Sequence, residues 1–182
     1  MKRPLTALAG AALVAASLSV SAPATASGVS SDDRIQMQDD CEQVSFEAAL
    51  GGGACGGDGD TTFSELVSSL LAGRPDGKWR MHSDDTHVRR GHGLHITNTG
   101  GEFHTFTEVS SFGPGCVSAI NDLMGLSGAP AADCGAAFGD ARTALPAGGS
   151  GTLPTAGMSV GTHLFECMVH PWMTARIDVR RR

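Results

Sequence analysis

Five apolar side chains between residues 63 and 71 recur at the spacing that places them on one face of a helix. They are Phe63, Leu66, Val67, Leu70 and Leu71, which follow the i, i+3, i+4, i+7 pattern. Thr62 and Glu65 form a capping-box pattern before this run, and Gly73 is placed to end the helix. The pattern predicts one amphipathic helix over residues 62–73 that covers one face or one end of a sheet.

After residue 77 the pattern changes from the helical period to the period of two that is typical of strands. Leu94 and Ile96, for example, alternate with His95 and Thr97. Short strands are predicted at residues 78–82, 87–90, 94–98, 102–109, 162–167 and 174–179. Several short strands with one helix predict an all-β fold, built as an antiparallel sandwich or a small barrel.

Two segments show neither period. Residues 27–40 are polar and acidic, and we expect them to form a loose arm. Residues 111–154 are rich in Gly, Ala and Pro and are expected to interrupt the sheet, with a short helix near 117–124. The chain is thus divided into an N-terminal extension with one helix at 27–77 and a β domain at 78–182, into which 111–154 is inserted.

The first 26 residues have the features of a secretory signal peptide. Lys2 and Arg3 precede an apolar stretch at 5–20, and the small residues Ala24 and Ala26 mark a cleavage site. The stretch is short for a membrane anchor, so we expect cleavage after Ala26 and no stable membrane insertion. An uncleaved anchor helix is the alternative. The mature chain would then be secreted into the periplasm or the extracellular space, where disulfides persist.

Composition narrows the classes of function. The 182 residues suffice for one core. Lys and Arg total 13 against 19 Asp and Glu, which gives a net charge of −6 and argues against a nucleic acid as partner. The sequence contains no evident hydrolytic triad or phosphate-binding loop. We therefore expect a protein that is not an enzyme, and we expect a monomer.

One stretch combines three side chains that bind soft metal ions. Cys167, His170 and Met173 follow one another at C-x2-H-x2-M spacing. The Cys ends one predicted strand and the Met precedes the next, so all three can turn inward from one loop. A thiolate, two imidazoles and a distant thioether are the ligand set of a blue-copper site. His104, in an upstream predicted strand, is the best candidate for the second imidazole; zinc in the same ligands, or a fold without metal, are the alternatives.

The two segments that carry these side chains also resemble a known family. Residues 102–107 (EFHTFT) and 167–173 (CMVHPWM) are similar to the cupredoxins of the plastocyanin and amicyanin group. The short ligand loop, with Pro171 directly after the second His, looks most like amicyanin. The resemblance covers about residues 79–109 and 161–179, and it implies a Greek-key β-sandwich. It also implies one copper ion in the centre, with the ligands His104, Cys167, His170 and Met173.

The resemblance carries further expectations about single residues. Thr105 stands where the family often has Asn, and it still offers a hydroxyl and a backbone amide that help to orient the Cys loop. His163 stands where the family usually has an aromatic residue, near the start of the strand that ends at the ligand Cys. In the family the His of the ligand loop reaches the surface, so His170 is expected to be the route for electrons, with Pro171 and Trp172 around it. Burial of Trp172 in the core is the alternative.

The chain contains five cysteines, so four remain once Cys167 is assigned to the metal. We prefer the pairs Cys41–Cys55 and Cys116–Cys134 among the three possible pairings. Each pair closes a short segment that lacks a core of its own, and each such bond stabilises by about 3 kcal/mol in the chain-entropy model. A second metal site formed by these cysteines is the alternative.

These observations predict a secreted one-electron carrier whose copper alternates between Cu(I) and Cu(II) and which exchanges electrons with a partner protein. Storage or delivery of copper outside the cell is the alternative. An oxidase is disfavoured, because the His-Cys-His strand motif of multicopper oxidases is missing. A binuclear copper centre would need two Cys in the ligand loop, and only Cys167 is there.

Overall fold

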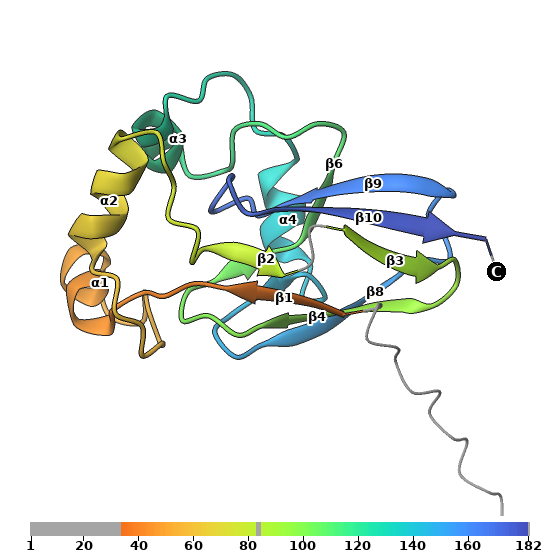
Figure 1. Ribbon diagram of the computed structural model, residues 1–182, viewed down its shortest axis with the longest axis horizontal. Helices are drawn as coiled ribbons and strands as arrows, with labels where there is room; N and C mark the ends of the chain where they lie inside the picture. Colours follow the sequence, from red (N-terminus) through yellow and green to blue (C-terminus); the bar gives the residue numbers. More distant parts are fainter. Residues whose placement is uncertain (1–33, 83–84, 182) are drawn as a thin grey trace, which may run out of the picture.

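The computed structural model describes residues 34–82 and 85–181, so the predicted signal peptide lies outside the described residues. The strands form two four-stranded sheets and a two-stranded one, and the short helices at residues 43–50, 63–71 and 118–124 lie at one end of them (Figure 1). Side chains from both larger sheets form one apolar cluster, which includes Ile35 and Ile96 from one sheet and Phe165 and Ile177 from the other. The all-β sandwich predicted from the sequence is confirmed.

The first sheet has the strand order β2-β1-β4-β8. It consists of β1 (Arg34–Gln38), β2 (Arg80–His82), β4 (Gly93–Asn98) and β8 (Ser150–Pro154). β1 runs antiparallel to β2 and parallel to β4, while β8 is antiparallel to β4. The sheet is therefore mixed, and not antiparallel throughout as the sequence analysis expected.

The second sheet has the order β3-β10-β9-β6. Its strands are β3 (Asp85–Arg89), β6 (Thr107–Val109), β9 (Gly161–Glu166) and β10 (Thr174–Arg180). β10 is antiparallel to β9 and parallel to β3. β9 and β10 are joined by the short loop 167–173, so this antiparallel pair fixes where that loop begins and ends.

The prediction of a loose arm at 27–40 is wrong for residues 34–38. Ile35 and Met37 of β1 are fully buried, whereas Arg34 and Gln36 are exposed. This alternation is the period-two signal of a strand, and the acidic residues around it masked the signal. β1 lies before the expected domain boundary at residue 77 and pairs with β2 and β4, which lie after it. The division into 27–77 and 78–182 stays a prediction.

The N-terminal region contains two helices where one was expected. α2 (Phe63–Leu71) matches the predicted helix, begins with the Thr62–Glu65 capping box and buries Leu66 and Leu70. α1 (Gln43–Leu50) was missed because Phe46 is its one buried residue, which gives no apolar face to recognise. No helix among the described residues is long and apolar enough to span a bilayer.

The predicted strand 102–109 is wrong as a single element. It divides at Phe106 into β5 (His104–Thr105), which pairs with β7 (Ala144–Leu145), and β6, which pairs with β9. The chain changes sheets here, so His104 and Thr105 are both buried although they are neighbours in sequence. Neighbouring side chains of a strand point to opposite faces, so in a strand with only one buried face they would not both be buried.

The segment 111–154 is less separate from the sheets than expected. The predicted short helix is confirmed as α3 (Ser118–Met124), and a second one, α4 (Cys134–Gly139), follows it. The end of the segment supplies β7 and β8, which pair with β5 and β4, so the insertion contributes to the sandwich. Both preferred disulfides are present, and the four cysteines do not form a second metal site. The bonded pairs are Cys41–Cys55 and Cys116–Cys134.

Candidate metal centre

Three of the four predicted ligands meet in one buried cluster. His104 comes from β5, Cys167 directly follows β9, and His170 lies in the loop 167–173. The sulfur of Cys167 is 3.8 Å from Nδ1 of His104 and 3.8 Å from Nδ1 of His170, and the two Nδ1 atoms are 3.2 Å apart. All three residues are at most 1% exposed. Three donors from two distant parts of the sequence therefore converge on one small space.

The size of this triangle fits a metal ion. A triangle with these sides has a point about 2.1 Å from all three corners, and first-row ions such as zinc bind imidazole nitrogen and thiolate sulfur at about 2.0–2.3 Å. One thiolate and two imidazoles are the donor types that copper prefers in its electron-transfer sites. The cluster could therefore hold a single copper ion.

The backbone of the ligand loop explains why Cys167 and His170 face the same space. The amide of Met173 donates to the carbonyl of His170 (2.8 Å), and the amide of Cys167 donates to the carbonyl of Met173 (3.0 Å). These bonds close a tight turn at the end of the β9–β10 pair. Met173 itself is fully buried in the core; its thioether as the fourth, axial ligand stays a prediction.

Thr105 holds the loop as the resemblance implied. Its backbone amide donates to the sulfur of Cys167 (3.4 Å), and its hydroxyl accepts from the amide of Met168 (2.8 Å). A hydrogen bond to the sulfur is one of the contacts that tune a metal thiolate. Thr105 thus links the strand of one imidazole to the loop that carries the other two ligands.

Each imidazole also contacts a carboxylate that the sequence analysis did not assign to the site. Oδ2 of Asp39 lies 2.8 Å from Nε2 of His104, and Oε2 of Glu102 lies 3.5 Å from Nε2 of His170. Burial raises the pKa of Asp39, but its bond to His104 and two backbone amides outweigh burial and hold that pKa at about 2. The Asp39 carboxylate is therefore ionised.

The charges of the metal-free cluster follow from the same contacts. Burial raises the pKa of the Cys167 thiol, but the two imidazoles outweigh burial and hold that pKa well below its ordinary value. Burial lowers the pKa of His170, whereas Cys167 and Glu102 raise it, with a net result of about 10. Without metal the cluster is thus a thiolate beside a protonated imidazole, and an ion that binds it must displace that proton.

The prediction that His170 reaches the surface is wrong. His170 is 1% exposed, Pro171 is buried and Trp172 is partly buried with its ring 5.2 Å from that of His170. The segment 111–154 also packs against this loop, because the amide of Cys116 donates to the carbonyl of Met168 (2.6 Å). Segments far away in the sequence cover the ligand loop, which the loop's own sequence does not reveal.

A buried acid that the sequence pattern did not predict lies beside the cluster. Glu166 directly precedes Cys167 and is fully buried. Its Oε2 accepts from the amide of Gly113 (3.0 Å), while Oε1 has no partner among the described residues. Burial raises the pKa of Glu166 to about 7, although the bond from Gly113 lowers it. The alternation of apolar and polar residues predicts a strand that includes Glu166. It does not indicate that other segments of the chain cover this end of the strand.

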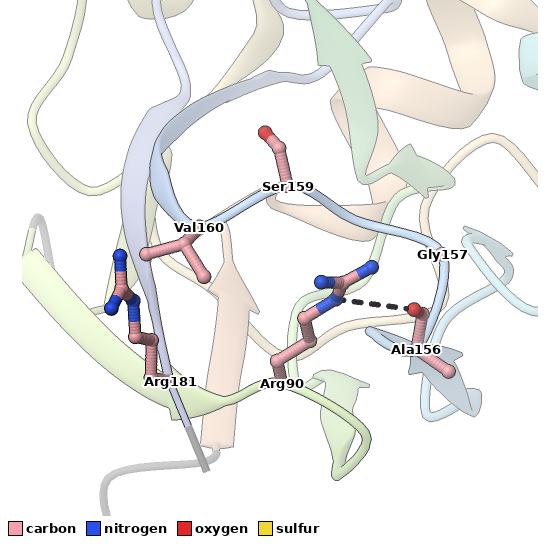
Figure 2. Close-up of a pocket in the computed structure, with 6 residues that line it drawn as sticks. All are labelled: Arg90, Ala156, Gly157, Ser159, Val160 and Arg181. Atoms are coloured by element: carbon pink, nitrogen blue, oxygen red, sulfur yellow. Dashed lines mark hydrogen bonds between the residues drawn. The ribbon is translucent and has the colours of Figure 1, made fainter.

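The surface hollow shown in Figure 2 has no part in this centre. It has a volume of about 860 Å³ and is lined by Arg90, Ala156, Gly157, Ser159, Val160 and Arg181. None of these residues belongs to the cluster, and none offers a thiolate, an imidazole or a carboxylate. Nε of Arg90 donates to the carbonyl of Ala156 (3.4 Å) across its edge. The candidate site is therefore the buried cluster.

Comparison with known proteins gives similarity in structure alone. No family model matches the sequence, and no curated protein matches it. A purple cupredoxin from Nitrosopumilus maritimus is similar with a TM-score of 0.41 and 12% identity, over 81% of this chain and 98% of that chain. An oxidised plastocyanin from Dryopteris crassirhizoma gives 0.39 and 15%, over 81% of this chain and 99% of that chain.

An oxidised amicyanin variant is also similar, with a TM-score of 0.35 and 16% identity over 57% of this chain and 76% of that chain. The three names agree with the resemblance of residues 102–107 and 167–173 to cupredoxins. Because all three TM-scores are below 0.5, the case for the metal centre rests on the donor geometry of this chain.

Proposed function

We propose that this protein is a mononuclear blue-copper protein that carries one electron at a time to or from a partner protein outside the cytoplasm. The observation that carries the proposal is the buried triangle of His104, Cys167 and His170. Copper in such a set of donors alternates between Cu(I) and Cu(II). His104, Cys167 and His170 would hold the ion, with Met173 as the distant fourth ligand.

The surroundings of the ligands suit a carrier. The turn hydrogen bonds of Met173, the bond that Thr105 donates to Cys167 and the bond that it accepts from Met168 hold the loop in one arrangement. A site that is held in this way changes little when the charge of the ion changes, and so little has to rearrange when an electron arrives. Cys167 is the one cysteine outside the two disulfides, which leaves a single thiolate for a single ion.

Burial also favours a carrier over a protein that delivers copper to an acceptor. A protein that delivers an ion must let ligands of the acceptor reach it, and all three residues that would hold it here are at most 1% exposed. The carrier should keep its copper through many redox cycles. The alternative would gain support if the copper passed readily to a competing protein.

Coulometric titration of the copper-loaded protein tests the proposal. We expect reversible uptake of one electron per protein chain, with the copper still bound after repeated cycles. Loss of copper on reduction, or no reversible step, would contradict the carrier. Protein loaded with zinc is the control, because zinc does not change its oxidation state.

A further inference from the structure

Each imidazole of the cluster contacts a carboxylate through the ring nitrogen that faces away from the cluster. The Nδ1 atoms point to the sulfur and to each other, while the Nε2 atoms meet the carboxylates of Asp39 and Glu102. These carboxylates are themselves buried, with side chains 1% and 10% exposed. The two histidines come from different elements but share one arrangement. In each, Nε2 contacts a carboxylate and Nδ1 faces the centre of the cluster.

The carboxylate of Asp39 is fixed in place by backbone amides. Oδ1 accepts from Cys41 (3.1 Å) and Gly101 (3.0 Å), and Oδ2 accepts from Glu102 (3.0 Å) as well as from His104. Gly101 has no room for a side chain, since a Cβ there would lie 2.6 Å from the sulfur of Cys41. The Cys41–Cys55 disulfide therefore packs directly against the turn that holds Asp39.

The carboxylate of Glu102 is fixed by an indole. Nε1 of Trp79 donates to Oε2 of Glu102 at 2.5 Å, and Trp79 is 1% exposed. The ring of Trp79 stacks on Phe46 of α1, with ring centres 6.1 Å apart. Helix α1 is therefore linked to His170 through Trp79 and Glu102.

This arrangement determines which nitrogen can bind an ion. An imidazole keeps a proton on Nε2 when that atom faces a carboxylate, and then Nδ1 is the nitrogen that can bind metal. Two Nδ1 lone pairs at 3.2 Å repel each other unless a cation or a proton lies between them. The geometry thus prepares both nitrogens for one positive ion.

We propose that Asp39 and Glu102 are positioning residues that orient the ligand imidazoles and bias the bound copper towards Cu(II). The inference rests on the proposed function, which it deepens. Two negative charges near the ion, in surroundings that water does not screen, stabilise the doubly charged ion more than the singly charged one. They also make the imidazoles better donors. Both effects lower the reduction potential.

The first test is Asp39→Asn, which removes the charge and leaves an oxygen that can accept from His104. Loss of such a partner typically weakens metal binding by about 10- to 100-fold. We expect Cu(II) affinity to fall about tenfold more than Cu(I) affinity, which for one electron raises the reduction potential by about 59 mV. Equal losses of Cu(II) and Cu(I) affinity would overturn the proposal, because a merely structural role predicts them.

Glu102→Gln is the second variant, and it keeps the proposal falsifiable if the Asn variant does not fold. We expect a rise of the potential in the same direction but smaller, since the contact of Glu102 with His170 is longer. Glu108→Gln is the matched control, because Oε1 of Glu108 contacts Nδ1 of His163 at 2.6 Å outside the cluster. An equal rise in the Glu108→Gln control would contradict the proposal.

Nitrogen-15 NMR of the histidine side chains in the metal-free protein separates this inference from the copper function. We expect the Nε2 proton of His104 to exchange slowly with water, and to exchange faster in Asp39→Asn. A protected proton in a protein that binds no copper would leave the positioning intact and defeat the proposed function. An unprotected Nε2 proton in the wild type would overturn the positioning by Asp39.

Discussion

Two carboxylate–histidine pairs of nearly equal length lie in very different surroundings. Asp39 and His104 are 2.8 Å apart with side chains 1% and 0% exposed, whereas Glu108 and His163 are 2.6 Å apart with side chains 52% and 10% exposed. Water screens the second pair and not the first, so the same contact differs in its contribution to stability. Burial, rather than distance, distinguishes the pair at the metal centre from an ordinary surface contact.

The largest effect is expected for the buried pair. In the metal-free protein, Asp39→Asn should lower the free energy of unfolding by about 3–5 kcal/mol, because it leaves buried groups without their charged partner. Urea denaturation, followed by circular dichroism, measures the change. A loss below about 1 kcal/mol would place Asp39 with the exposed pairs and remove the contrast.

An intermediate effect is expected where an indole holds the second carboxylate. Trp79→Phe removes the donor to Glu102 and should lower the free energy of unfolding by about 1.5–3 kcal/mol, the range for a bond to a charged group. Trp172→Phe is the matched control, because Nε1 of Trp172 has no hydrogen-bond partner among the described residues. Equal losses in the two variants would mean that packing, and not the bond to Glu102, accounts for the effect of Trp79→Phe.

The smallest effect is expected for the exposed pair. Burial lowers the pKa of His163, but Glu108 and the carbonyl of Ser159 raise it above its ordinary value of 6.5. The folded state therefore binds the proton more tightly, and the resulting stability is present below about pH 6.5 and is lost as the pH rises through the raised pKa. Glu108→Gln should cost less than about 1 kcal/mol at pH 5 and nothing measurable at pH 9. A loss that is equal at both pH values would show that the charge of His163 plays no part.

The sequence predicts the ligand loop well because its information is local. Cys167, His170 and Met173 lie within one turn between two strands, and the structure closes that turn with their own backbone groups. The split of the strand at Phe106 could not be predicted, because it depends on pairing with β7 and β9 from distant parts of the chain. The alternation of side chains along 102–109 predicts a single strand in one sheet. It cannot indicate that the chain passes from one sheet to another within that segment.

The partners of the ligands were harder to predict for the same reason. Asp39 stands among acidic residues that resemble a solvated arm, and its role follows only from the pairing of β1 with β4. The alternation of Ile35 and Met37 could have identified that strand. The burial of His170 has no such signal, because Glu102, Trp172 and the backbone around Cys116 come together over it only in the fold.

The visible absorption spectrum of the Cu(II)-loaded protein tests the central claim most directly. A short bond from copper to the thiolate of Cys167 should give an intense blue colour that bleaches on reduction. Cys167→Ser should abolish the colour, because a hydroxyl supplies no sulfur charge transfer, while Glu108→Gln should leave it unchanged. A folded, copper-loaded wild type without this absorption band, or a Cys167→Ser variant that stays blue, would contradict the assignment of the centre.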